Sequence, residues 1–165
     1  MRPAADRTGP ALEGSHIGSP RDVLRCLQQI TPGLMPGESL VLFLDREQQV
    51  LTYLHMAYDP FCPIGPSIQN IFRDAFARQA SRLVIVTSHP SCRTGPFMPA
   101  GDYVQHAAKC SLAGQLLDLR LIDYLVCNTT DTQSLLLDCR DELYRYALHY
   151  SQQVASAYPP DLCPN

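Results

Sequence analysis

Two kinds of hydrophobic pattern alternate along this chain, and together they predict an α/β fold. Short continuous apolar runs, too short to be buried helices, are typical of strands that are covered on both faces. Other segments repeat apolar residues at i, i+3 and i+4, as helices do when they bury one side. Predicted strands cover residues 40–44, 50–56, 83–86 and 119–127, and predicted helices begin near residues 19, 67 and 102 and within 134–156. This order predicts a central mixed sheet flanked by helices, an α/β or α+β domain.

The two ends of the chain differ in composition from its middle. Residues 1–18 are polar and rich in proline and glycine, which predicts a disordered leader. The predicted domain covers residues 19–138, and residues 139–165 are expected to form a C-terminal helix and tail. The chain has no apolar run of about eighteen residues, and its first residues lack the apolar core of a secretory signal. We therefore expect no membrane segment and a cytoplasmic location.

The net charge limits which partners the sequence favours, and the cysteines indicate the redox compartment. The net charge is −3, and Lys109 is the only lysine beside twelve arginines. Because surfaces that bind nucleic acid usually carry a basic stripe, and no such stripe is visible here, the composition argues against direct nucleic-acid binding. The seven cysteines are scattered and form no Cys-x-x-Cys pair. They are expected to act as small apolar fillers in a reducing compartment.

The candidate chemistry lies where the strand at 83–86 runs into a His-Pro-Ser turn. His89 follows this strand, and Asp102 comes thirteen positions later at the start of a predicted helix. A zinc hydrolase site needs three protein ligands, usually histidines and carboxylates, together with a nearby base. His89 and Asp102 fit two of these ligands. Each also has an interpretation without metal, because Asp102 suits the first turn of a helix and His89 can bind a backbone carbonyl.

Residues 19–138 resemble the JAB/MPN domain of the RadC family, which was once described as a family of DNA-repair proteins. The resemblance is carried by Ser-Pro-Arg-Asp-Val at 19–23, Val-Leu-Phe-Leu-Asp at 41–45, and the helix at 67–80 that leads into Leu-Val-Ile-Val at 83–86. The stretch 116–126 is similar to a late leucine-rich segment of the family. This resemblance implies a cytidine-deaminase-like mixed sheet flanked by helices and the chemistry of zinc metallopeptidases.

The family's metal motif is a glutamate, then His-x-His, then Ser-x-x-Asp around one zinc ion. Aligned on it, His-x-His falls on Thr87-Ser88-His89, and the serine falls on Pro99. Threonine is a poor zinc ligand beside imidazole, and proline has no hydroxyl or N–H to stabilise an oxyanion. The aspartate falls on Asp102. Glu38 lies one position from the family's glutamate, and Gly37 occupies the matching position.

Two interpretations follow from this degenerate motif. In the first, the chain is a non-catalytic relative of the zinc metallohydrolases that binds a protein partner not identified by the sequence. In the second, it is a zinc-dependent metallopeptidase or isopeptidase with altered ligands. Here Glu38 would be the base, His89 and Asp102 would bind zinc, and His106 or Cys92 would substitute for the missing ligand. Zinc is the cofactor implied by the second interpretation, and the first requires none.

Two further expectations concern surfaces. The apolar residues Leu51, Tyr53, Leu54 and Met56 would allow homodimerisation if their strand lies at a sheet edge. The C-terminal helix could pack over the degenerate motif, in which case Arg140 or Tyr144 would fill the space of the metal.

Overall fold

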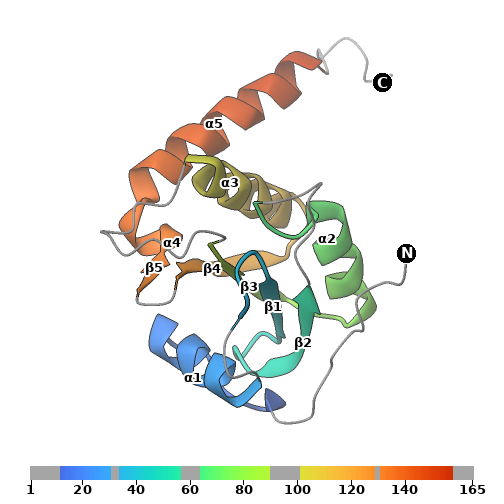
Figure 1. Ribbon diagram of the computed structural model, residues 1–165. Coiled ribbons are helices and arrows are strands. Elements are labelled where there is room, and N and C mark those ends of the chain that lie inside the picture. Colours follow the sequence, from blue (N-terminus) through green and yellow to red (C-terminus); the bar gives the residue numbers. More distant parts are fainter. Residues whose placement is uncertain (1–11, 31–33, 57–63, 90–100, 129–130, 158–165) are drawn as a thin grey trace, which may run out of the picture.

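A five-stranded mixed sheet forms the centre of the described part of the protein (Figure 1). The computed structural model describes residues 12–30, 34–56, 64–89, 101–128 and 131–157. The strand order is β2-β1-β3-β4-β5. The strands are β1 Ser39–Leu44, β2 Val50–Met56, β3 Arg82–Ser88, β4 Arg120–Cys127 and β5 Thr132–Ser134.

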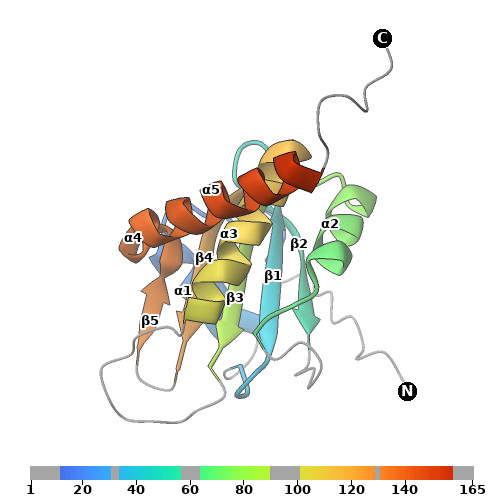
Figure 2. The same ribbon diagram turned by 90° about the horizontal axis from the view of Figure 1, so that it is seen from above.

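Helices cover both faces of this sheet, which confirms the α/β fold predicted from the sequence. The helices are α1 Pro20–Ile30, α2 Ile68–Ala77, α3 Gly101–Leu116, α4 Leu135–Asp138 and α5 Arg140–Ala157. Helix α1 packs on one face, whereas α2 and α3 pack on the other. Figure 2 shows α5 crossing the outer side of α3. Among the residues that the structure describes, no helix is long and apolar enough to cross a membrane.

The pairing of the strands explains their hydrophobic patterns. β1 lies between β2 and β3 and is antiparallel to both, and all six of its side chains are buried. β3 and β4 are parallel, with α3 in the connection between them, as parallel pairing requires a crossover. Val41 and Phe43 of β1 face α2 and α3, whereas Leu40, Leu42 and Leu44 face α1. Strands covered on both faces therefore appear in the sequence as continuous apolar runs.

Part of the segment predicted as a leader belongs to the folded domain. Leu12 and Ile17 are fully buried in the core under α1. The backbone around them pairs with the start of β2, since Gly14 N donates to Val50 O at 2.9 Å and Val50 N donates to Ser15 O at 2.9 Å. The packed structure thus begins before residue 19. Two single apolar side chains in a polar segment are buried in the core, and the average composition of the segment does not predict this. Residues 1–11 lie outside the described residues.

Strand β2 lies at one edge of the sheet, as the homodimer prediction requires. Its side chains are largely used within the domain. Tyr53 and Leu54 are buried on opposite faces, and Leu51 and Met56 are partly buried. Any pairing of a second chain at this edge would therefore rest on the backbone of β2 more than on its apolar side chains.

Candidate functional site

The end of β3 meets the start of α3 at the position of the degenerate metal motif. His89 continues β3, and its backbone N–H donates to the carbonyl of Cys127 at 2.7 Å. The imidazole of His89 is partly exposed and lies 5.7 Å, between ring centroids, from the ring of Tyr103. Asp102, the neighbour of Tyr103, is exposed in the first turn of α3. The fold thus brings the regions of the two predicted metal ligands to the same end of the sheet.

Thr87 occupies the first position of the His-x-His motif and is fully buried. Its hydroxyl lies 3.1 Å from the hydroxyl of Ser39 on β1 and 3.4 Å from the hydroxyl of Tyr124 on β4. Ser39 and Thr87 are paired in the β1–β3 register, so their side chains share one face. The threonine hydroxyl therefore lies among polar groups of two neighbouring strands.

This contact is part of a longer hydrogen-bonded chain, which we call the polar chain: Ser39, Thr87, Tyr124, His106 and the carbonyl of Pro66. His106 Nε2 lies 3.0 Å from the Pro66 carbonyl, and His106 Nδ1 lies 3.0 Å from the Tyr124 hydroxyl. Because a carbonyl only accepts, Nε2 carries the proton and Nδ1 accepts from Tyr124. Burial lowers the pKa of His106 to about 4, so the ring is neutral near pH 7. Thr87 can then donate to Tyr124, and Ser39 to Thr87.

The loop before α2 packs against the polar chain at Gly65, and the contact requires glycine at this position. A Cβ on Gly65 would lie 2.6 Å from the Tyr124 hydroxyl and 3.2 Å from Cε1 of His106. The carbonyl of Ile64 lies 3.3 Å from the same hydroxyl, a second and more distant acceptor. Only a residue without a side chain allows the backbone this close to the polar chain.

Glu38, the predicted base, lies on the other face of the sheet. Its Oε2 accepts the backbone N–H of Met35 at 2.9 Å and pairs with Nε2 of His55 at 3.0 Å. Both side chains are mostly buried. Glu38 continues the even-numbered positions of β1, which face α1, whereas Thr87 faces α3. This is the consequence of a one-residue slip in a strand.

The position that matches the family's glutamate has an unusual backbone. Gly37 has a φ of +84° and its N–H donates to Ser88 O at 2.9 Å. This left-handed conformation favours glycine over any residue with a side chain. A glutamate at this position would therefore be strained as well as displaced from the extended strand.

The described residues do not fit a three-ligand zinc centre. Among them, no group of three His, Cys, Asp or Glu side chains could hold a metal ion. His106, a predicted substitute ligand, uses both ring nitrogens in the polar chain. Cys92, the other substitute, and Pro99 lie outside the described residues. His89 and Asp102 are the two motif residues of suitable chemistry that the structure describes at this end of the sheet.

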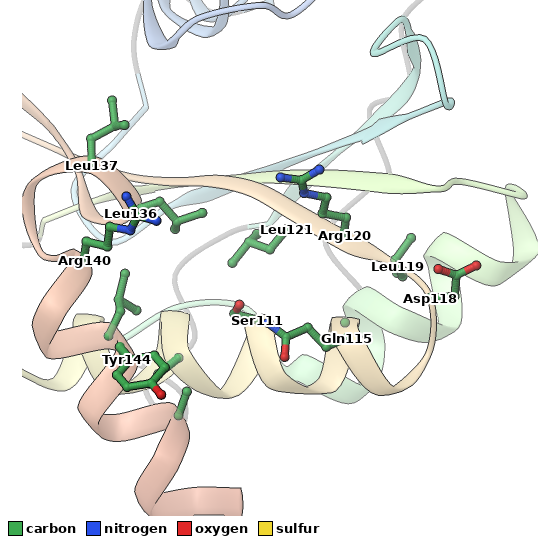
Figure 3. A pocket seen from close by; sticks show the side chains of 14 residues that line it. Ser111, Gln115, Asp118, Leu119, Arg120, Leu121, Leu136, Leu137, Arg140 and Tyr144 are labelled. Carbon is green, nitrogen blue, oxygen red and sulfur yellow. The ribbon is translucent and has the colours of Figure 1, made fainter.

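The part of the C-terminal helix that carries Arg140 and Tyr144 packs against the second half of α3, whereas Tyr146, further along it, reaches the start of α3 beside Gly101. Arg140 and Tyr144 line a cavity of about 700 Å³ between α3, α4, α5 and the start of β4 (Figure 3). Its lining on α3 runs from Ala108 to Gln115, and Gln115 lies roughly 20 Å from Asp102 along the helix axis at 1.5 Å per residue. In this arrangement Arg140 and Tyr144 lie away from the motif.

A five-stranded mixed sheet flanked by helices on both faces is consistent with the JAB/MPN class of domains. The chain belongs to the RadC-like JAB domain family, whose model matches residues 17–141, and this confirms the resemblance drawn from the sequence.

Relatives of known sequence agree with this family. A UPF0758 protein of Flavobacterium johnsoniae is 25% identical over 124 residues, which cover 75% of this chain and 53% of that protein. The UPF0758 protein tlr1707 of Thermosynechococcus vestitus is 37% identical over 67 residues, covering 41% of this chain and 26% of that protein. The matched region thus spans about half or less of each of these relatives. Most of α5 lies beyond the end of the family match.

Two members of the polar chain, Ser39 and Tyr124, were not predicted from the sequence. The Tyr124 hydroxyl is the one whose removal is easiest to test. Tyr124→Phe is expected to lower the free energy of unfolding by about 1–2 kcal/mol, because it leaves the buried His106 Nδ1 with the weak thiol donor of Cys110, at 3.9 Å, in place of the hydroxyl. Urea unfolding measures this change. Tyr144→Phe is the matched control: its side chain is 69% exposed, so it should change stability by less than about 0.5 kcal/mol. Equal effects of the two substitutions would contradict the polar chain.

Proposed function

We propose that this RadC-like JAB domain does not carry out the metallopeptidase reaction and serves as a protein-interaction module. The observation that carries the proposal is the polar chain. The first motif position holds Thr87, which is fully buried and lies within hydrogen-bonding distance of Ser39 and Tyr124. The space that an imidazole ligand would need is thus occupied by neutral groups that satisfy one another.

The chemistry of Thr87 supports this proposal. Zinc in hydrolase sites is bound by imidazole or carboxylate, and a neutral hydroxyl binds it weakly. A buried hydroxyl that gave up its protein partners for a metal would also leave Ser39 and Tyr124 with fewer hydrogen bonds, at a cost of about 1–3 kcal/mol for each unsatisfied group.

The position of Glu38 is a second support. A general base must lie within hydrogen-bond reach of the proton that it removes, directly or through one water molecule. The Glu38 carboxylate is bound to His55 and to the backbone of Met35 on the α1 side of the sheet. A base there is separated by the sheet from a substrate bound at His89.

A specific observation favours the alternative, a zinc-dependent metallopeptidase or isopeptidase with altered ligands. His89 and Asp102 have the residue types of zinc ligands and lie at the junction of β3 and α3. This hypothesis needs a third ligand, and the sequence offers Cys92 for it.

The zinc content of the purified protein separates the two functions. Under the proposed function, protein prepared without chelator or polyhistidine tag is expected to carry well below one zinc per chain by atomic emission. His89→Ala should then have the same metal content and a melting temperature close to that of the wild type. His149→Ala, which removes an exposed histidine of α5, is the matched control.

Peptide hydrolysis is the companion measurement. About one zinc per chain that His89→Ala removes and His149→Ala retains, together with cleavage of peptide or isopeptide bonds, would overturn the non-catalytic proposal. Zinc retained by both His89→Ala and His149→Ala would mean that the metal binds at another site and that His89 is not a zinc ligand.

The partner and the compartment are also proposals. A protein partner is favoured over nucleic acid by the net charge of −3. Beyond Val50, whose backbone pairs with Gly14 and Ser15, the outer edge of β2 offers a backbone surface for a second copy of the chain. A reducing compartment such as the cytoplasm is supported by the four cysteines in the described residues, which are all free. Burial raises the pKa of Cys110 to about 12 and that of Cys127 to about 11, as expected for unreactive fillers.

A further inference from the structure

Three arginines from neighbouring strands line one cavity at the end of the sheet opposite to His89. Arg46 follows β1, Arg82 begins β3 and Arg120 begins β4. Together with Ser81 and Asp118 they line a cavity of about 470 Å³. We call this cavity the arginine pocket. It belongs neither to the metal motif nor to the polar chain.

The sheet register brings these arginines to one place. Arg82 and Arg120 are direct partners in the parallel β3–β4 ladder, and Leu44, two residues before Arg46, is the partner of Arg82 on β1. Residues paired in this way project on the same face of a sheet. In Figure 3 the Arg120 side chain leaves β4 on the side away from α3, whereas Leu121 points toward α3. The register therefore fixes the backbone positions of Arg82 and Arg120, and Arg46 lines the same cavity from the turn after β1.

Acidic partners are scarce around this cluster. The ion pairs of the described residues involve Arg25, Arg73 and His55, and none of them involves an arginine of the pocket. Among the residues that the structure describes in the pocket lining, Asp118 is the one acid. Arg82 Nη1 donates at 2.8 Å to the side-chain oxygen of Gln48 when that amide is turned toward it, a neutral partner that orients the guanidinium. Like charges on directly paired strand positions are unfavourable unless an anion lies between them.

We propose that the arginine pocket binds the phosphate group of a small phosphorylated molecule. The planar guanidinium carries donors in a fork that matches the oxygens of a phosphate, and several such forks from a rigid sheet form a preorganised site. The pocket is small, although half open to solvent, and the chain as a whole is negatively charged, which fits a compact phosphate monoester better than a long polyanion. The Ser81 hydroxyl adds a neutral donor in the lining.

Calorimetric titration of the full chain tests the site, with inorganic phosphate, adenosine 5′-monophosphate and uncharged adenosine as probes. We expect phosphate and the nucleotide to bind, adenosine not to bind, and the affinity to fall as salt rises from about 50 to about 300 mM. Arg120→Gln should weaken binding at least about tenfold. Asp118→Asn should strengthen it, because it removes the acid from the lining. Arg145→Gln, an exposed arginine of α5 outside the pocket, is the matched control and should not change binding.

Thermal unfolding separates loss of the site from loss of the fold. Without phosphate, Arg120→Gln should melt at the same temperature as the wild type or higher, since it relieves repulsion from Arg82. With phosphate, the wild type, Arg145→Gln and Asp118→Asn should gain stability, and Arg120→Gln should gain clearly less. The proposal is overturned if neither probe binds the wild type at millimolar concentration, if Arg145→Gln weakens binding as much as Arg120→Gln, or if only a single-stranded oligonucleotide binds.

Discussion

Acidification from pH 7 to pH 4 is expected to lower the free energy of unfolding by about 3 kcal/mol through His106 alone. Burial lowers the pKa of this histidine from 6.5 to about 4 in the folded protein. Between the folded and unfolded pKa values the imidazole is protonated in the unfolded chain and neutral in the folded protein. The free energy of unfolding therefore falls as the pH falls. Above about pH 7 the ring is neutral in both states, and the effect vanishes.

Urea unfolding at several pH values, compared between the wild type and His106→Gln, measures this effect. The substitution should lower stability near pH 7, because the glutamine cannot reproduce both bonds of the ring, but it should flatten the dependence between pH 6.5 and pH 4. Asp123 acts with the opposite sign, since burial raises its pKa and its folded form retains a proton as the pH rises. That contribution is common to both proteins and cancels in the difference. Equal slopes in the two proteins would refute the neutral, buried state of His106.

Gly114→Ala is expected to lower the free energy of unfolding by about 3 kcal/mol. Gly114 is buried in the last turn of α3, where the Leu119 N–H donates to its carbonyl at 2.8 Å. A Cβ on Gly114 would collide with the carbonyl oxygen of Leu119, and this neighbour is backbone that cannot swing aside. The gain in helix propensity, about 1 kcal/mol, is too small to offset the collision.

Gly101→Ala is the matched control for this prediction. The nearest atom to a Cβ on Gly101 is the hydroxyl oxygen of Tyr146 at 3.7 Å, an ordinary contact. This substitution should change the free energy of unfolding by less than about 0.5 kcal/mol. A loss below about 1 kcal/mol for Gly114→Ala would show that the turn between α3 and β4 shifts easily, and would contradict the close packing of this turn against Gly114.

Much of the fold could be predicted because its local patterns were unambiguous. The apolar runs at 40–44 and 83–86 form central strands, and the stripe at 67–80 forms α2. The start of the domain was harder to predict than its strands. Leu12 and Ile17 are single apolar residues in a polar segment, and only the structure shows that they are buried in the core. Composition measures an average, whereas packing depends on individual side chains.

The site divides in a similar way. Local spacing singled out His89 and Asp102, because a strand end and a helix start are local features. The resemblance to the RadC family identified Thr87 as the altered first ligand. What Thr87 does instead depends on Ser39, 48 residues away, and on Tyr124, 37 residues away. No periodicity in the sequence links residues at such separations.

The sequence by itself determined the family, the helices and the central strands, because these follow from the local alternation of apolar and polar residues and from motif order. Only the tertiary structure decided which face of the sheet Glu38 occupies, that His106 is a member of the polar chain, and that three arginines share one pocket. The physical reason is that strand register and crossover connections set these contacts, and register is a property of the assembled sheet.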